Sequence, residues 1–409
     1  MFSIGVVGAG QFARHFMPLF QAHPLISRVV VTDLMAERRV EFASTFGVDT
    51  VESFEDMLAS DIDAVAIFTQ RHLHGPQAIA ALEAGKHVYS AVPMALDIAD
   101  IERIIDLVRT TRLTYYMGET CYYFPAAIYC REQYRAGTFG EFVYAQSQYY
   151  HDMDHGFYEA YQYSGGESWR RVAGIPPMYY PTHTVGPVVA ATDSYVTKVS
   201  CMGYVDKRDD GVFGVGNNDW DNPFSNQVAI QQLANGGIHR VLEFRRVGIR
   251  KPGTHIGLFL GTTGSYEFAY SHHVLQQDAG GGRMEATLLD EMLNAPELER
   301  VRDRPEFVDV VANARLEPQY MSPVMPTHRL PAEFDGIAAG HRGSHKFLVD
   351  DFAKAVVSGK LAPVHAWASA RYTIPGLVSH ESAVRGGVAL DVPDFGEPPS
   401  DWEVLELDA

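Results

Sequence analysis

The chain has 409 residues, a length that suggests two or three domains and excludes a small disulfide-stapled module. Its 33 basic and 51 acidic residues give a formal charge of −18, so we expect no nucleic-acid partner. A hydrophobic fraction of 46% with 21% charged residues predicts a chain that folds throughout.

Short β-rich runs alternate with helix-period segments through residue 121, which predicts a doubly wound parallel sheet of the Rossmann type. We expect strands at 2–7, 28–32, 64–68, 86–90 and 114–117. We expect helices at 12–21, 36–46, 75–84 and 98–109, with Gly85 ending the third of them.

The pattern changes after residue 121, where longer alternating or aromatic runs predict a large, mostly antiparallel sheet. Its expected strands are 142–150, 197–202, 226–233, 239–244 and 256–260. A loop over 206–223, a glycine-rich bend over 278–283 and a helix over 346–357 complete this pattern. The sequence therefore predicts an α/β fold with a dinucleotide-binding domain at 1–121 and an α+β domain for substrate binding and oligomerisation at 122–409.

Neither a basic leader nor an apolar stretch of membrane-spanning length is evident, so we expect a cytoplasmic protein that does not interact with membranes. The three cysteines, Cys121, Cys130 and Cys201, have neither zinc-site nor redox-pair spacing. We expect reduced thiols and no metal site.

A glycine fingerprint follows the first expected strand. Gly8 permits a tight turn, Gly10 lets a pyrophosphate approach the backbone, and Ala13 allows close helix packing. Asp33 ends the second strand, where a carboxylate accepts the ribose hydroxyls of NAD and repels the 2′-phosphate of NADP. NAD is therefore favoured, although Arg38 and Arg39 leave NADP open.

The run at 85–93, GKHVYSAVP, resembles the Gfo/Idh/MocA oxidoreductase family, which usually has G-K-H-V-x-x-E-K-P there. The family has an N-terminal Rossmann domain and a C-terminal sheet domain. Ala91 and Val92 replace the glutamate and the lysine that helps handle the substrate hydroxyl proton. Valine cannot ionise, which disfavours ordinary sugar-alcohol dehydrogenation.

Within that family the chain resembles NAD-dependent glycosidases of the α-N-acetylgalactosaminidase type. A related cytoplasmic set in the superfamily is similar to NAD-dependent sulfoquinovosidases. Shared motifs include RAGTFGE at 135–141, YYHD at 149–152, YPTHTVGP at 180–187 and Gly340-His341. The chain departs from the subgroup at Thr184, commonly glycine, and at Ala91, commonly glutamate.

The resemblance implies transient oxidation at C3 of a sugar, removal of the C2 proton, loss of the aglycone, addition of water and return of the hydride. It implies that Tyr149 is the C2 base, with Tyr150 as the fallback, and that His183 acts on the C3 side. The implied substrate contacts are Tyr180, Arg170, Trp169, His151 and Tyr122. The implied cofactor contacts are Gly8, Gly10, Gln11, Phe12, Asp33, Thr69, His74, Val92 and Pro93.

The sequence thus predicts an NAD-dependent glycosidase acting on a small glycoside, with a sugar dehydrogenase or a non-catalytic NAD-binding sensor as alternatives. Arg170, Arg171, Arg250 and Lys251 offer cations, so an anionic glycoside such as a sulfoquinovoside is the leading substrate hypothesis. N-acetylgalactosaminides and neutral glycosides follow it. Because large sheets in this family commonly pair between subunits, the apolar strands at 226–270 predict a homodimer or homotetramer.

Overall fold

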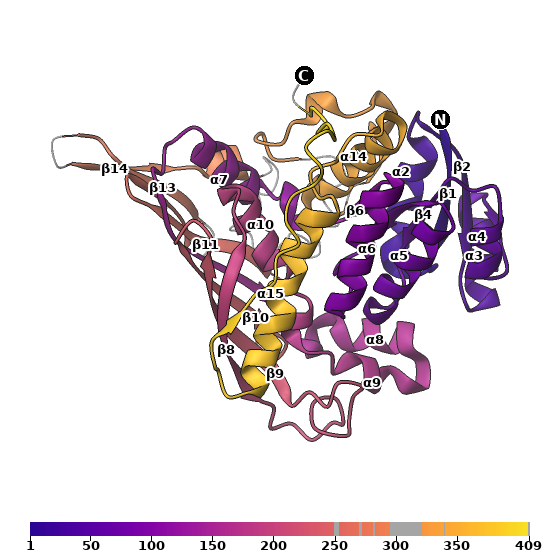
Figure 1. Cartoon of the computed structure of the whole chain (residues 1–409), viewed down its shortest axis with the longest axis horizontal. Coiled ribbons are helices and arrows are strands. Elements are labelled where there is room, and N and C mark those ends of the chain that lie inside the picture. The colour runs from indigo at the N-terminus through magenta and orange to yellow at the C-terminus, as the bar shows by residue number, and fades with distance from the viewer. Residues whose placement is uncertain (249–252, 270–271, 281–282, 295–320, 339, 408–409) are drawn as a thin grey trace, which may run out of the picture.

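A computed structural model describes residues 1–248, 253–269, 272–280, 283–294, 321–338 and 340–407. Two sheets lie at opposite ends of the molecule, with helices between and around them (Figure 1). The six-stranded N-terminal sheet is entirely parallel in the order β3-β2-β1-β4-β5-β6, which is a doubly wound arrangement. Its strands are β1 (Phe2–Val7), β2 (Ile26–Thr32), β3 (Asp49–Thr50), β4 (Ala64–Ile67), β5 (His87–Ser90) and β6 (Tyr115–Met117).

Helices cover both faces of this sheet, as expected for a fold in which crossover helices connect parallel strands. They are α1 (Gln11–Arg14), α2 (Met17–Ala22), α3 (Ala36–Phe46), α4 (Phe54–Ala59), α5 (His74–Glu83) and α6 (Ile98–Thr111). The predicted helix at 12–21 is wrong in one respect, because it is divided between Arg14 and Met17. Pro18 has no amide hydrogen, so it cannot continue a helix from Arg14 and instead lies in the first turn of α2.

The second sheet has nine strands in the order β14-β13-β12-β11-β7-β10-β9-β8-β15. All described pairings are antiparallel except that of β7 with β10, which is parallel, so the prediction of a mostly antiparallel sheet is confirmed. The strands are β7 (Phe142–Tyr150), β8 (Val196–Val205), β9 (Phe224–Leu233), β10 (Ile238–Phe244), β11 (Gly253–Gly261), β12 (Gly264–Ala269), β13 (His272–Asp278), β14 (Met284–Leu288) and β15 (Leu390–Asp391).

The remaining helices fill the space between the sheets and cover their ends. They are α7 (Pro125–Arg135), α8 (Tyr158–Gly165), α9 (Trp169–Ala173), α10 (Thr182–Thr192), α11 (Asp290–Leu293), α14 (Ser344–Ser358) and α15 (Ala366–Val384). Helix α15 contacts α6 of the first domain as well as α10 and β8 of the second (Figure 1). The predicted loop at 206–223 is confirmed, whereas Gly281 and Gly282 of the predicted bend lie outside the described residues.

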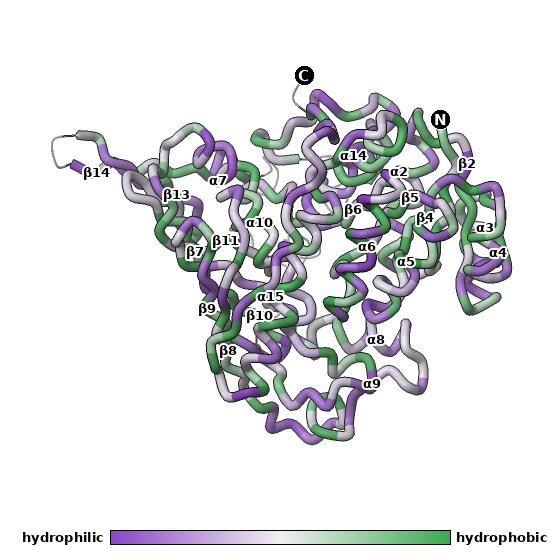
Figure 2. Tube along the Cα trace, viewed as in Figure 1, coloured by the Kyte–Doolittle hydropathy of each residue, from purple (hydrophilic) through white to green (hydrophobic). Residues whose placement is uncertain are grey.

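Burial alternates along the second sheet, because one of its faces is covered by helices and the other is exposed. Figure 2 accordingly shows apolar and polar residues interleaved along these strands. On β9, for example, Gln227, Ala229 and Gln231 are fully buried while Ile230 is 46% exposed. Among the described residues, no helix is both long and apolar enough to cross a membrane.

Candidate functional site

The carboxyl ends of the N-terminal strands face the second domain, and ligands of doubly wound sheets bind at that edge. Gly8 follows β1, Thr69 comes shortly after β4, Val92 follows β5, and Glu119 follows β6. Because the four strands are parallel neighbours, these residues come to one edge of the sheet.

The glycine turn fits a dinucleotide. Gly8 has φ +96°, and a Cβ there would lie 2.9 Å from the Phe68 carbonyl oxygen, so the turn requires glycine. A Cβ on Gly10 would meet nothing within 4 Å, which leaves the backbone open to a phosphate. Asp33 is held at the end of β2 by an Oδ2 that accepts a 2.8 Å hydrogen bond from the Ala9 amide. The carboxylate thus lies beside the turn, as NAD binding requires.

The loops after β4 and β5 are linked by His74. Its Nδ1 lies 2.8 Å from the Pro93 carbonyl oxygen and its Nε2 lies 3.1 Å from the Thr69 carbonyl oxygen. Burial lowers the pKa of His74 to about 4, so the ring is neutral and donates from one nitrogen. His74 therefore fixes the two loops that carry the predicted cofactor contacts Thr69, Val92 and Pro93.

Gln11 and Phe12 begin α1 beside the glycine turn. Gln11 is exposed, and the Phe12 ring is edge-on to Phe68 and to His341, at centroid distances of 5.8 and 5.7 Å. Phe12 thereby connects the cofactor turn with the Gly340-His341 motif of the second domain.

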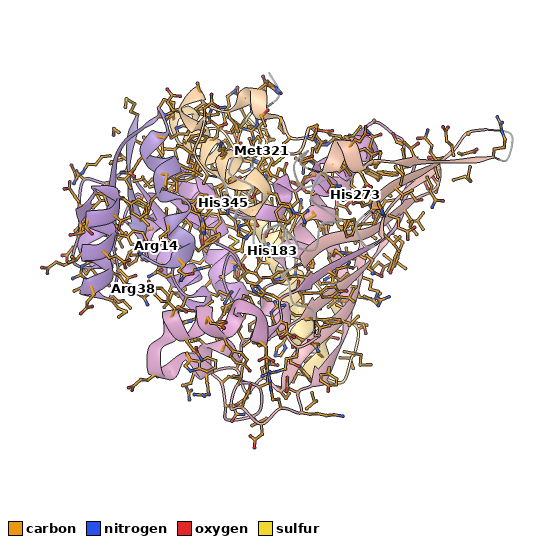
Figure 3. All side chains as sticks on the ribbon, turned by 180° about the vertical axis from the view of Figure 1, so that it is seen from behind. Arg14, Arg38, His183, His273, Met321 and His345 are labelled. Atoms are coloured by element: carbon orange, nitrogen blue, oxygen red, sulfur yellow. The ribbon has the colours of Figure 1, made fainter. Side chains whose placement is uncertain are left out.

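His183 lies in the first turn of α10 and forms a buried ion pair with Glu119 of the first domain. Its Nδ1 donates to Glu119 Oε1 over 2.7 Å, and Figure 3 shows His183 between the two domains. Burial alone would lower the pKa of His183, but Cys121, Glu119 and Tyr180 hold it well above the usual value. Burial raises the pKa of the Cys121 thiol, so the negative charge beside the imidazole is that of Glu119.

Glu119, Cys121 and His183 also offer three donor atoms within 4.8 Å of one another, a spacing that a metal ion could use. The Nδ1–H of His183 is already donated to Glu119, and the Cys121 thiol is neutral, so the arrangement suits an ion pair better. The absence of a metal site stays a prediction.

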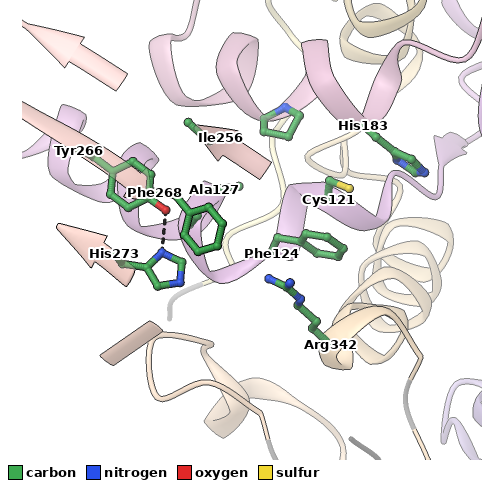
Figure 4. Close-up of a pocket in the computed structure, with 11 residues that line it drawn as sticks. Cys121, Phe124, Ala127, His183, Ile256, Tyr266, Phe268, His273 and Arg342 are labelled. Atoms are coloured by element: carbon green, nitrogen blue, oxygen red, sulfur yellow. Dashed lines mark hydrogen bonds between the residues drawn. The ribbon is translucent and has the colours of Figure 1, made fainter. Parts of the chain in front are cut away.

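A small pocket with a cavity volume of about 20 Å³ opens next to His183 and Cys121 (Figure 4). Its other walls come from α7 and from β11 to β13, where the Tyr266 hydroxyl and His273 Nδ1 form a 2.7 Å hydrogen bond. The Arg342 side chain also lines this pocket. The pocket adjoins the His183 side of the site and has room for about one water molecule.

Tyr149 ends the inward-facing row of β7 and meets His183 nearly at right angles, with ring centroids 5.2 Å apart. Its hydroxyl lies 2.7 Å from His151 Nδ1. Burial, then Arg245, Arg71 and His183, lower the pKa of His151 well below its usual value. The neutral imidazole can therefore accept the hydroxyl proton of Tyr149.

The structure distinguishes the two tyrosines of the YYHD motif. Tyr149 also packs against Tyr180, with ring centroids 5.8 Å apart, while Tyr150 stacks on Phe244 at the opposite face of the sheet. Side chains alternate along a strand, so only one of the two can face the site. That residue is Tyr149.

A second buried carboxylate, Glu243, lies on β10, where it is paired with Tyr149 of β7. It accepts a 2.8 Å hydrogen bond from the Thr184 hydroxyl and pairs with Arg245 over 3.0 Å. The Arg245 guanidinium lies 4.8 Å from the centre of the Tyr149 ring. Burial raises the pKa of Glu243 to about 7, although Arg245 and Thr184 lower it. Thr184, one of the departures from the subgroup, thus ties α10 to β10.

The segment that contains α8 and α9 belongs to the second domain and contacts the cofactor domain. Arg71 donates a 2.6 Å hydrogen bond to the Tyr161 hydroxyl, and Arg38 donates a 2.5 Å bond to the Tyr163 carbonyl. Figure 3 shows Arg38 on the N-terminal domain. Arg38 therefore links the N-terminal domain to α8.

Three predicted substrate contacts lie apart from the Tyr149–His183 pair. Arg170 is exposed, stacks on Trp169 and donates to the Asp210 carbonyl oxygen. Trp169 packs in a small separate core beneath α8 and α9. Tyr122 stacks with Arg131 at 4.1 Å. Their roles as substrate contacts stay predictions.

Sequence reasoning missed Glu119, Arg71, Glu243 and Arg245. Glu119 and Arg71 follow strands whose carboxyl ends were predicted, so strand ends alone could have drawn attention to both. The contacts of Glu243 and Arg245 depend on strand pairing, which the sequence did not reveal.

Comparison with known proteins agrees with this geometry. The model of the Gfo/Idh/MocA oxidoreductases, an oxidoreductase family with an NAD-binding Rossmann fold, matches residues 2–119. Residues 2–119 therefore resemble the NAD-binding domain of that family. The predicted resemblance, the Rossmann domain and NAD as the cofactor are confirmed.

The chain is similar to proteins named glycosyl hydrolase family 109 protein, which agrees with the predicted glycosidase resemblance. One from Saccharopolyspora erythraea is 23% identical over 96% of this chain and 83% of that protein. One from Shewanella amazonensis is 30% identical over 45% of this chain, a match that spans only 43% of that protein.

Solved structures share the fold at lower sequence identity. Levoglucosan dehydrogenase in complex with NADH and levoglucosan has a TM-score of 0.71 and 18% identity, over 96% of this chain and all of that one. An oxidoreductase domain protein from Kribbella flavida has a TM-score of 0.69 and 19% identity, covering 96% and 99%. At these identities the likeness establishes the fold alone.

Proposed function

We propose that this chain is an NAD-dependent glycosidase that cleaves a small glycoside through transient oxidation of the sugar. Two neighbouring proton-accepting pairs, His183–Glu119 and Tyr149–His151, carry the proposal. Simple oxidation of an alcohol removes one proton, from the hydroxyl group. Elimination of an aglycone removes a second proton, from carbon, and therefore needs a second acceptor.

In its neutral form, which is populated as pH rises towards its raised pKa, His183 would accept the proton of the C3 hydroxyl group at Nε2. Its Nδ1–H remains donated to Glu119, which fixes the tautomer and stabilises the imidazolium that forms. Val92, at the position where the family usually has lysine, has no ionisable atom, so His183 is the acceptor that the site supplies.

Tyr149 would remove the C2 proton, which an adjacent C3 ketone makes acidic. As the tyrosine oxygen takes that proton, the hydroxyl proton passes to His151 Nδ1, 2.7 Å away. Burial and Tyr180 raise the pKa of Tyr149, which disfavours a free tyrosinate, while His183, Arg245 and Arg71 oppose that rise. A concerted transfer to neutral His151 avoids a free tyrosinate.

NAD⁺, when bound, supplies a hydride acceptor that gives the hydride back, so the overall reaction is hydrolysis without net oxidation. Loss of the C2 proton expels the aglycone from C1 as an oxyanion. Water then adds its oxygen to C1 of the resulting enone, and the proton that this water gives up neutralises the aglycone. His151 and Tyr149 return a proton to C2 in that step, and His183 returns one to the C3 oxygen.

Deuterium incorporation tests the reaction class. In deuterated water, hydrolysis of a glycoside by the NAD-loaded protein should place deuterium at C2 of the released sugar. Stoichiometric NADH without release of the aglycone would instead identify a sugar dehydrogenase, and binding without turnover would identify a sensor.

Variants separate the two proton transfers. Tyr149→Phe should still reduce NAD⁺ in a single turnover but lose C2 exchange and aglycone release by about 10²- to 10⁴-fold. His183→Ala should lose both steps. Tyr150→Phe is the matched control, because its side chain lies on the opposite face of β7. If Tyr150→Phe, rather than Tyr149→Phe, lost C2 exchange, the assignment of the base would be wrong.

We further propose that the substrate is an anionic glycoside such as a sulfoquinovoside, ahead of N-acetylgalactosaminides and neutral glycosides. Arginines near the site support this order, although Arg250 and Lys251 lie outside the described residues. A panel of aryl glycosides of sulfoquinovose, N-acetylgalactosamine, glucose and galactose tests it through the ratio of kcat/KM values.

A further inference from the structure

Arg71 is a cation enclosed by aromatic rings at the junction of the two domains. It begins a 3₁₀ turn (Arg71–Leu73) shortly after β4, and its guanidinium lies 4.5 Å from the centre of the Tyr180 ring and 5.4 Å from that of Tyr161. Aromatic faces stabilise a cation but leave its N–H groups without acceptors. Of its five N–H groups, one donates to the Tyr161 hydroxyl at 2.6 Å, and a further hydrogen bond reaches the Tyr180 side chain.

Two more deeply buried arginines meet carboxylates, whereas buried Arg131 stacks on Tyr122 and donates to its backbone carbonyl. Arg245 pairs with Glu243 at 3.0 Å, and Arg329 contacts Asp350 and Asp351 at 2.9 and 2.8 Å. Within the described ranges, Arg71 forms no ion pair with a carboxylate. Arg71 is partly buried and keeps access to solvent, so its guanidinium is open to an anion supplied by a ligand.

Arg71 is close to the residues that move protons. The Tyr180 ring that it covers lies 5.0 Å from the His183 ring and 5.8 Å from the Tyr149 ring. The charge of Arg71 also lowers the pKa of both Tyr149 and His151. A ligand that contacts the Tyr149 hydroxyl group and the His183 ring therefore lies near the guanidinium.

We propose that Arg71 binds an anionic substituent of the sugar, a sulfonate or a carboxylate, and so determines substrate specificity. This inference rests on the proposed glycosidase function. A planar guanidinium can donate two parallel hydrogen bonds to either group, and such charge-assisted pairs are about twice as strong as neutral ones. Arg170, the cation favoured by the sequence, is exposed to solvent and already donates to a backbone carbonyl.

Direct binding measures this selectivity without relying on turnover. The NAD-loaded full chain is titrated calorimetrically with sulfoquinovose, glucuronate and glucose. The wild type should bind at least one charged sugar more tightly than glucose, and the sulfonate and carboxylate arms show which anion it prefers. Arg71→Gln should weaken binding of that charged sugar by about 10- to 100-fold and leave glucose binding unchanged.

The control variant is Arg103→Gln, which makes the same charge change at an exposed residue of α6 that pairs with Glu83. Thermal stability and NAD content check that each variant folds. If Arg71→Gln does not fold, Arg71→Lys takes its place: it keeps the charge but loses the bidentate contact, and should lose part of the preference.

Three results would overturn the proposal. They are a wild-type protein that binds charged and neutral sugars equally, an Arg71→Gln protein that keeps the wild-type preference, and a loss that occurs in Arg170→Gln instead. Because binding is measured without turnover, failure of the deuterium test would remove the proposed reaction while leaving a charge preference at Arg71 intact. Hydrolysis without a charge preference in binding would support the proposed reaction and remove the proposed role of Arg71.

Discussion

Replacing Glu119 by glutamine tests the role of the buried pair that His183 forms across the domain junction. The Glu119 side chain is fully buried and the His183 side chain is 6% exposed, with Nδ1 and Oε1 2.7 Å apart. Removing one partner of a buried ion pair costs about 3 to 5 kcal/mol, because the other charge is left without compensation. The imidazolium that forms when His183 accepts a proton would lose that stabilisation, so kcat/KM should fall by about 10²- to 10⁴-fold.

The same variant should change the pH dependence of the reaction. His183 must be neutral at Nε2 to accept a proton, so activity rises with pH as His183 deprotonates. Because Glu119 helps hold the pKa of His183 well above its usual value, glutamine should move this acidic limb to lower pH.

The assay is kcat/KM against pH for the NAD-loaded wild type and for Glu119→Gln. Glu83→Gln, an exposed change of the same kind on α5, serves as the control and should leave the profile unchanged. An acidic limb that stays in place, or moves to higher pH, in Glu119→Gln would refute the assignment of His183 as the proton acceptor.

Three further predictions concern the cofactor, stability and assembly. Gly10→Val should abolish the thermal stabilisation by NAD⁺, which is about 2.7 kcal/mol at 100 times the Kd. The Tm of the apoprotein should stay near that of the wild type, because a Cβ at this position meets nothing within 4 Å. An unchanged response to NAD⁺ in a thermal scan would contradict the predicted cofactor turn. Glu243 has a pKa raised to about 7, so the stability it contributes is complete below about 4.5 and is lost as pH rises towards 7. In urea unfolding, the free energy of unfolding of Glu243→Gln should therefore rise by about 3 kcal/mol relative to that of the wild type across this pH window. A difference between the two proteins that does not change with pH would count against the raised pKa. The wild type should be a dimer or tetramer by light scattering, and Ile230→Glu on the exposed face of β9 should shift it towards monomer, whereas a monomeric wild type would remove the predicted sheet-to-sheet pairing.

Much of the fold could be predicted because its strands follow simple patterns of burial. The strand expected at 142–150 coincides with β7, whose burial alternates, and the strand expected at 2–7 coincides with β1, which is buried on both faces. Helix α15 was missed because Pro375 and Gly376 within it resemble a helix end. Gly376 is needed there, since a Cβ would lie 2.2 Å from the Met178 carbonyl oxygen.

The site was only partly predictable, for a different reason. Tyr149 and His183 belong to motifs of consecutive residues and could be identified from the sequence. Arg71 belongs to none, and its environment is made by Tyr161 and Tyr180, about a hundred residues further along the chain. Only the packing of the second domain on the first reveals an arginine whose neighbours are aromatic rings and not carboxylates.

The position of β6 has a consequence for how the chain is made. It is the outermost strand of the N-terminal sheet, and its open side is covered late, by the Met117 amide bonding to the Val364 carbonyl and by the Tyr116–His365 bridge. At about 5 to 20 residues per second, roughly 12 to 50 seconds separate the synthesis of Met117 and Val364. Throughout that interval the nascent chain exposes an apolar edge strand, the kind of surface that templates aggregation. The ribosome-bound chain is therefore a form in which this strand edge is open to pairing with another chain.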